Sequence, residues 1–69
     1  MVEVFKTNVL KHDEARKLLR GLRKKFPGFK INFDLEDCDR VLRVEAKKVS
    51  AEKIIRLMGT FKYQCKVLE

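Results

Sequence analysis

The chain has 69 residues, of which 45% are hydrophobic and 39% charged, with three Gly and one Pro. This length allows one core and excludes two domains, and the composition excludes a disordered or low-complexity chain. The net charge of +7, from 17 Lys and Arg against 10 Asp and Glu, favours acidic partners or surfaces.

The first elements along the chain are a predicted strand and a predicted helix. Val2 to Val9 is rich in β-branched and aromatic residues, which predicts a strand, although the face that carries Phe5 stays open. We expect the helix to be capped by Asp13 and to end at Pro27-Gly28. Its apolar side chains recur at helical spacing and are Ala15, Leu18, Leu19, Leu22 and Phe26.

A hairpin is predicted next. Apolar and polar residues alternate from Phe29 to Leu35, which predicts a strand with one buried face. The polar cluster Glu36 to Asp39 predicts a tight turn, and Val41 to Ala46 predicts the return strand. The inward residues of the return strand are expected to be Leu42, Val44 and Ala46.

A second helix and a last strand complete the pattern. Val49 is a candidate staple residue and Ser50 a candidate cap, and we expect Gly59 to fray or end the helix. The apolar stripe of this helix comprises Ala51, Ile54, Ile55 and Met58. Tyr63 to Leu68 is the predicted fourth strand, with Cys65 facing the core, where cysteine acts as a small apolar residue.

The element order predicts an α+β fold in a single domain, residues 1–69. Because each crossover is right-handed and both helices must bury their apolar stripes, the two helices should cover the same face of the sheet. The prediction is a ferredoxin-like βαββαβ sandwich with a four-stranded antiparallel sheet. Three connections then emerge at one end of the molecule, and they bring together His12, Cys38, Lys62 and Tyr63.

Three stretches of the chain resemble the heavy-metal-associated (HMA) domain family, copper-chaperone-like modules of this topology. The end of that family's first helix and its second strand are similar to KKFPG followed by KINFDLED. The start of its second helix is similar to VSAEKII, and its closing strand is similar to YQCKV. The resemblance implies the fold, and it implies docking of a partner through the first helix and the loop from Leu10 to Asp13.

The metal-binding loop of that family has the pattern Met-x-Cys-x-x-Cys, and this chain departs from it. Leu10 stands at the position of the Met, and His12 and Ala15 stand at the positions of the two Cys. Cu(I) prefers two soft sulfur ligands, which an imidazole and a methyl group do not supply. The resemblance therefore implies a degenerate domain, to which we carry over none of the family's ligands.

His12 and Cys38 form the candidate metal site that remains. A Cys and a His can bind Zn²⁺ or Cu ions when other ligands complete the shell, whereas alone they are half a site and His12 is more simply an exposed residue. Asp34, Glu36, Asp37 and Asp39 place four carboxylates within six residues, but their spacing fits no calcium loop. We expect no cofactor, with Cu or Zn at His12 and Cys38 as the alternative.

The basic face of the first helix is the most distinctive exposed feature. Between Lys11 and Lys25 seven basic residues stand against two acidic ones, an excess of 7 − 2 = 5. Such a face can neutralise phosphates, meet an acidic protein patch, or only keep the helix soluble. RNA-binding proteins of this topology stack bases on aromatic side chains of the open sheet face. Here polar residues are expected on that face, namely Lys30, Asn32, Arg43, Glu45, Gln64 and Lys66.

We expect neither catalysis nor a membrane segment. The chain has one His, few hydroxyl groups (Thr7, Ser50 and Thr60) and no glycine-rich phosphate loop. The start MVEVFKTNV lacks the apolar run of a signal sequence, so we expect a cytoplasmic protein with reduced thiols.

The function predicted from the sequence is a non-catalytic binding module that docks an acidic protein surface. The candidate partner-binding residues are Leu10, Lys11, Arg16, Lys17, Arg20, Arg23, Lys24 and Lys62. Metal binding at His12 and Cys38 is the alternative function and nucleic-acid binding the third. The expected state is a monomer or a weak dimer.

Overall fold

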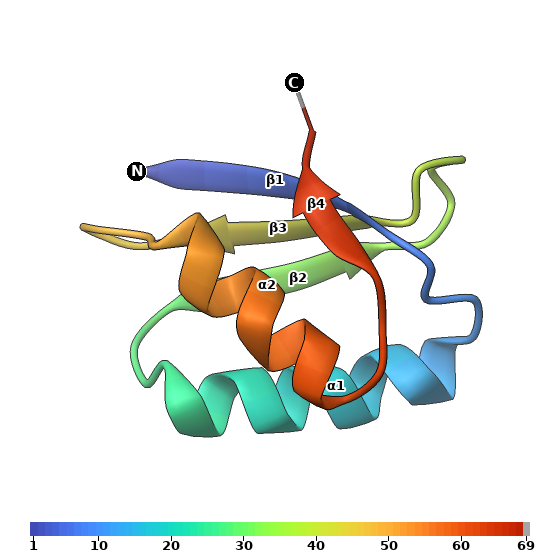
Figure 1. Cartoon of the computed structure of the whole chain (residues 1–69), viewed down its shortest axis with the longest axis horizontal. Helices are drawn as coiled ribbons and strands as arrows, with labels where there is room; N and C mark the ends of the chain where they lie inside the picture. The colour runs from blue at the N-terminus through green and yellow to red at the C-terminus, as the bar shows by residue number, and fades with distance from the viewer. Residues whose placement is uncertain (69) are drawn as a thin grey trace.

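Four strands and two helices follow one another in the predicted order. The computed structural model describes residues 1–68. The elements are β1 (Val2–Thr7), α1 (His12–Lys25), β2 (Lys30–Asp34), β3 (Val41–Glu45), α2 (Ala51–Thr60) and β4 (Cys65–Val67). The strands form one antiparallel sheet in the order β2-β3-β1-β4 (Figure 1). The predicted α+β fold, a ferredoxin-like sandwich, is confirmed.

The inner face of the sheet carries the core. Phe5 of β1 lies opposite Leu42 of β3 and Val67 of β4, and Ile31 of β2 lies opposite Val44 of β3. The helices complete the same buried cluster with Ala15, Leu18, Leu22, Ile54 and Met58. Phe5, whose face the sequence left open, is fully buried. One core under both helices is therefore formed, with α1 against β2 and α2 against β4.

The start of α1 differs from the prediction. Lys11, not Asp13, occupies the cap position, and the helix begins at His12. The Glu14 carboxylate accepts a hydrogen bond from the Lys11 backbone N–H at 3.1 Å, whereas Asp13 accepts one from the adjacent Glu14 N–H at 2.9 Å. The Glu14 carboxylate thus binds the backbone N–H of the cap residue, as a Glu does at this position of a capping box, and it also lies favourably in the helix dipole.

The predicted stop of α1 is confirmed. The last helical residue is Lys25, and the Phe26 N–H donates to the Leu22 carbonyl at 2.8 Å. Pro27 follows, and Gly28 has φ +85°, a conformation that glycine adopts without steric penalty. The chain then turns into β2.

All four strands are shorter than the predicted runs, and the hairpin is present. β4 departs most, since it spans Cys65–Val67 and the prediction ran from Tyr63 to Leu68. β1 stops at Thr7 because the Thr7 hydroxyl donates to the Arg40 carbonyl and accepts from the Val9 N–H at 3.3 Å, which turns the chain out of the sheet. Val9 and Leu35 lie outside the strands but remain buried. β2 and β3 pair with Lys30 opposite Glu45 and Asp34 opposite Val41.

The start of α2 agrees with the prediction and its end lies further along the chain. The Ser50 hydroxyl accepts from the Lys53 N–H at 3.3 Å, and Val49 is buried beside it. The helix continues through Gly59 to Thr60. The Phe61 N–H then donates to the carbonyls of Leu57 and Met58 at 3.2 and 3.1 Å.

The two helices contact each other at a glycine. A Cβ atom built on Gly21 would lie 2.6 Å from Cζ of Phe61, so the aromatic ring occupies the space of the missing side chain. In the part of the chain that the structure describes, neither helix is long and apolar enough to cross a bilayer.

Candidate functional site

Hydrogen bonds join the three connections at one end of the molecule, as the topology predicts. The Tyr63 hydroxyl, after α2, donates to Glu14 Oε2 in the first turn of α1 at 3.0 Å. The Gln64 N–H donates to Asn8 Oδ1 at 2.8 Å, which links the α2-β4 loop to the β1-α1 loop. Arg40, at the end of the β2-β3 turn, hydrogen-bonds to the Leu10 carbonyl in the β1-α1 loop. The N-terminal end of α1 therefore lies against both other connections.

Arg40 fastens the hairpin turn to the loop before α1. Its guanidinium donates to the carbonyl of Leu35 at 3.0 Å and to the carbonyl of Leu10 at 3.4 Å. Arg40 has φ 48°, in the left-handed region that non-glycine residues rarely adopt. The Leu10 carbonyl is thus held by Arg40, whereas the apolar side chain of Leu10 faces solvent, since the residue is 65% exposed.

The contact between Tyr63 and Glu14 shifts the pKa values of both groups. The hydrogen bond from Tyr63 lowers the pKa of Glu14, and the backbone N–H of Lys11 lowers it further. The same bond raises the pKa of Tyr63, with partial desolvation adding to the increase. Folding therefore favours a charged carboxylate beside a neutral phenol at neutral pH.

The predicted basic face of α1 is exposed along the whole helix. Its five members, together with Lys11 before the helix, all lie in solvent: Arg16, Lys17, Arg20, Arg23 and Lys24. Among residues 1–68 the ion pairs are Lys6 with Asp39, Arg43 with Glu45 and Arg56 with Glu52, none of which involves α1. The charges of this face are thus not neutralised within the described chain.

The three arginines of this face line a hollow together with an apolar side chain. Arg16, Arg20 and Arg23 line a shallow hollow of about 280 Å³ together with Leu19. Leu19 was predicted as part of the core stripe, but it is only partly buried and packs at the margin of the core. The outer side of α1 therefore offers one apolar side chain next to three arginines, and we call these four residues the arginine hollow.

Lys62 belongs to the same end of the molecule as the start of α1. It is exposed, has φ 70°, and precedes Tyr63, whose hydrogen bond to Glu14 holds the loop against the helix. The candidate partner-binding residues are thus all accessible. They extend from the loop end around Leu10 and Lys62 along the outer side of α1.

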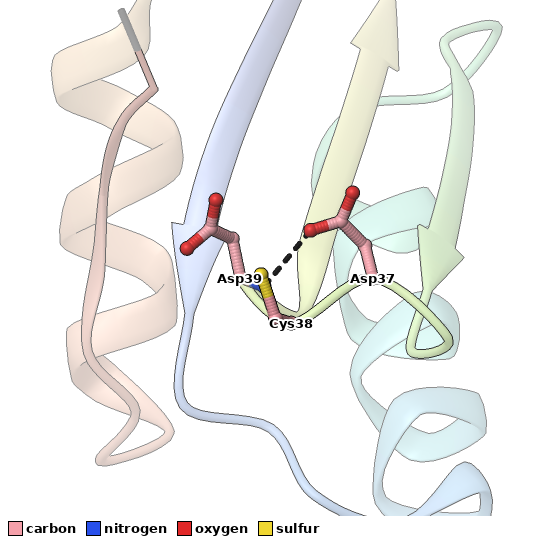
Figure 2. Close-up of side chains that lie close together, drawn as sticks. All are labelled: Asp37, Cys38 and Asp39. Atoms are coloured by element: carbon pink, nitrogen blue, oxygen red, sulfur yellow. Dashed lines mark hydrogen bonds between the residues drawn. The ribbon is translucent and has the colours of Figure 1, made fainter.

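Cys38 lies between two carboxylates at the tip of the β2-β3 turn. The ligand atoms of Asp37, Cys38 and Asp39 lie within 4.8 Å of one another, and Figure 2 shows the two carboxylates on either side of the sulfur. Asp37 Oδ1 accepts from the Asp39 N–H at 2.9 Å, and Asp39 Oδ1 lies 3.7 Å from Lys6 Nζ. Each carboxylate thus already has a partner.

His12 does not belong to that cluster, which is the one group of three or more such ligands found in residues 1–68. Sequence reasoning paired Cys38 with His12, but the structure groups Cys38 with its own neighbours in the turn. Cys65 is partly buried, and burial raises the pKa of its thiol to about 12. Both cysteines are free, as predicted.

The open face of the sheet is mostly polar, with apolar residues such as Val4 and Val41 on its two central strands. Cross-strand pairs on this face set Val4 opposite Arg43, and Lys6 opposite both Val41 and Lys66. No aromatic side chain projects from a strand on this face within the described chain, since Phe5 points inward. The base-stacking platform of RNA-binding sheets is therefore missing from these strands.

The structure has a groove between the two helices that the sequence did not predict. The groove has a volume of about 690 Å³ and is lined by Lys25, Phe26, Lys53, Arg56, Leu57 and Thr60. Its members come from the end of α1 and the outer side of α2, which are far apart in sequence. The only signal available in the sequence was Leu57, an apolar residue outside the predicted stripe of α2.

A scan against models of protein families and a search of curated proteins both find no match to this chain.

Proposed function

We propose that this protein is a small non-catalytic binding module, a degenerate HMA-like domain, that docks an acidic protein surface through the outer side of α1. The observation that carries the proposal is the arginine hollow, which Arg16, Arg20 and Arg23 line together with Leu19. The loop end with Leu10, Lys11 and Lys62 extends this surface.

The charge pattern of α1 supports an acidic partner. Arg16, Arg20 and Arg23 lie within two turns of one helix and form no ion pair with residues 1–68. Their mutual repulsion is relieved when carboxylates bind, and a guanidinium can hold a carboxylate through two parallel hydrogen bonds. Arginine beside a partly buried apolar side chain is also a frequent composition of interaction hot spots.

Affinity purification with charge-reversal variants tests this proposal. The wild-type chain and the variant R16E/R20E/R23E are used as baits in nuclease-treated lysate of the source cells, and recovered proteins are quantified by mass spectrometry. The variant has a net charge of 7 − 6 = +1. We expect proteins enriched by the wild type to be lost from this variant, and to share acidic surface segments.

The matched control is K47E/K48E/K66E, which has the same net charge of +1 and changes three exposed residues outside the helices. It should retain the partners. If both variants lose them equally, the binding depends on overall charge only, and if neither loses them, α1 is not the docking surface. Circular dichroism verifies that each variant is folded.

Metal binding is a second candidate function, favoured by the ligand atoms of Asp37, Cys38 and Asp39 within 4.8 Å. Zn²⁺ and, under reducing conditions, Cu(I) are titrated into the ¹⁵N-labelled chain, with C38S as the control. Saturable shifts at Asp37, Cys38 and Asp39 that disappear in C38S would support a site in the turn, and only shifts that also include His12 would support the site at His12 and Cys38. No shift at stoichiometric metal would remove this candidate.

A further inference from the structure

The groove between α1 and α2 has charged walls and an apolar floor. Phe26 and Leu57 are partly buried, and they supply the apolar surface. Lys25 stands on the α1 side, and Lys53 and Arg56 stand on the α2 side, all exposed. The basic groups thus lie on opposite walls, with apolar side chains between them.

Two aromatic contacts fix the shape of this groove. The Phe26 and Phe29 rings lie with their centroids 5.2 Å apart, which supports Phe26 from behind the end of α1. The Phe61 ring rests on Gly21, one turn before Lys25, so the residue that follows α2 packs against α1 there. The groove lies beside that contact, and its apolar residues are held in place before any ligand arrives.

The charges of the groove are available to a ligand. Among residues 1–68, Lys25 and Lys53 form no ion pair. Arg56 pairs with Glu52 at 2.7 Å, but both side chains are more than 70% exposed, and an exposed pair of this kind contributes little and exchanges readily. The Thr60 hydroxyl donates its hydrogen bond to the Arg56 carbonyl at 3.1 Å, so this proton is already used within α2.

We propose that this groove binds a peptide segment in which acidic residues flank a single apolar side chain. The apolar side chain packs between Phe26 and Leu57, and the carboxylates on its two sides meet Lys25 on one wall and Lys53 with Arg56 on the other. Because the groove is open to solvent, it suits a segment of a larger partner. The inference rests on the proposed function, since it names the part of an acidic partner that this chain recognises.

Selection from a random 12-residue peptide display library tests the inference on the full chain. Hen lysozyme, another small basic protein, serves as the counter-selection bait and removes peptides that bind positive charge alone. We expect enriched peptides to share acidic residues on both sides of one Leu, Ile or Phe. In ¹⁵N spectra, a synthetic peptide of that consensus should shift Lys25, Lys53, Leu57 and Thr60.

The affinity of the selected peptide for variants of the chain then shows which groove residues contribute to binding. K25Q/K53Q should weaken the selected peptide about fivefold, since it removes two exposed charge pairs. L57A should weaken it about tenfold, because it truncates the apolar contact. K47Q/K48Q has the same net charge of 7 − 2 = +5 as K25Q/K53Q and should bind as the wild type does. If L57A is poorly folded, the comparison of the two lysine variants decides.

Several results would overturn the inference. They are the absence of any enriched peptide, a consensus without acidic residues, equal loss of binding in both lysine variants, and groove shifts caused by anionic phosphatidylserine vesicles but by no peptide. Peptides that shift Arg16, Leu19 and Arg23 instead would reject the groove and leave the proposed function of α1 intact. Failure of the proposed function is read separately, from the affinity purification with R16E/R20E/R23E.

Discussion

A single hydrogen bond, between Tyr63 and Glu14, joins two segments that are distant in sequence. They are 49 positions apart in sequence, and their hydrogen bond of 3.0 Å holds the end of α2 against the start of α1. Ser50 acts as the cap that its residue type predicts, since its hydroxyl accepts from Lys53. Asp13 was wrongly predicted as a cap, because a neighbouring carboxylate, Glu14, reaches the Lys11 N–H instead.

Tyr63→Phe should raise the pKa of Glu14 toward its ordinary value of 4.5, because the largest cause that lowers it is removed. A lowered pKa in the folded state stabilises the fold above pH 4.5, and this contribution is lost as the pH falls through the folded-state value. Carboxyl NMR titration of the wild type and the variant measures the shift. An unchanged pKa of Glu14 in Tyr63→Phe would contradict the hydrogen bond.

The pKa of Tyr63 is raised in the folded state, so its contribution to stability depends on pH in the opposite direction to that of Glu14. Its contribution to stability is complete below the ordinary value of 10.0 and is lost as the pH rises through the folded-state value. Unfolding by urea at pH 7 and above pH 10 should therefore show a larger difference between wild type and Tyr63→Phe at pH 7.

Cys65 should react far more slowly with a maleimide than it does in the unfolded chain. Burial raises the pKa of its thiol to about 12, so at pH 8 its thiolate fraction is about a thousandfold below that of an ordinary cysteine. Cys38 is exposed and should label first in the native protein. Mass spectrometry of timed samples measures both sites, with labelling in 6 M guanidinium as the equal-rate control. Equal native rates would place Cys65 outside the core.

For the two helices, the spacing of apolar residues predicts which side chains are buried, but it does not predict where the helices contact each other. The stripes with Leu18 and Leu22 and with Ile54 and Met58 face the sheet as their spacing predicts. The contact between Gly21 and Phe61 has no counterpart in the spacing of either helix.

Gly21→Ala should therefore have an effect that depends on Phe61. Alanine is favoured over glycine inside a helix by about 1 kcal/mol, but its Cβ would lie 2.6 Å from the Phe61 ring. In the background Phe61→Ala we expect the full gain of about 1 kcal/mol in the free energy of unfolding. In the wild type the displaced ring should cancel most of this gain. Urea unfolding of the four chains gives the coupling, and equal effects in both backgrounds would refute the contact.

At the scale of the whole molecule, one small core must stabilise every element. A chain of 69 residues is expected to have a free energy of unfolding of only about 3 to 10 kcal/mol. Phe5, Leu42 and Val44 are all fully buried in that core. The surface, by contrast, carries most of the charge, and it can change without loss of the fold.

Leu42→Ala should cost about 3 to 5 kcal/mol through lost burial and a residual cavity, which is enough to unfold much of the protein at 37 °C. Val67→Ala is the matched control, since Val67 flanks Phe5 on the other side but is 36% exposed. It should cost about 1 kcal/mol or less. Thermal unfolding followed by circular dichroism compares the two variants, and similar melting temperatures would show that the core is not centred on these strands.

The amino-acid sequence alone was enough to predict the element order, the buried stripes, the Ser50 cap, the stop at Pro27-Gly28 and the fold. These features depend on periodicity and on the conformational preferences of residues close together in the chain, which a single sequence displays. It also located the basic face of α1, because consecutive turns of one helix place those residues together.

The residues that share a site across long stretches of sequence became known from the three-dimensional structure alone. It placed Phe5 in the core and formed the groove between Lys25 and Lys53. This is because the angle and separation of two packed helices depend on a few side chains at their contact. Here the Phe61 ring, just past the end of α2, packs on Gly21 of α1, and no periodic pattern in the chain encodes that contact.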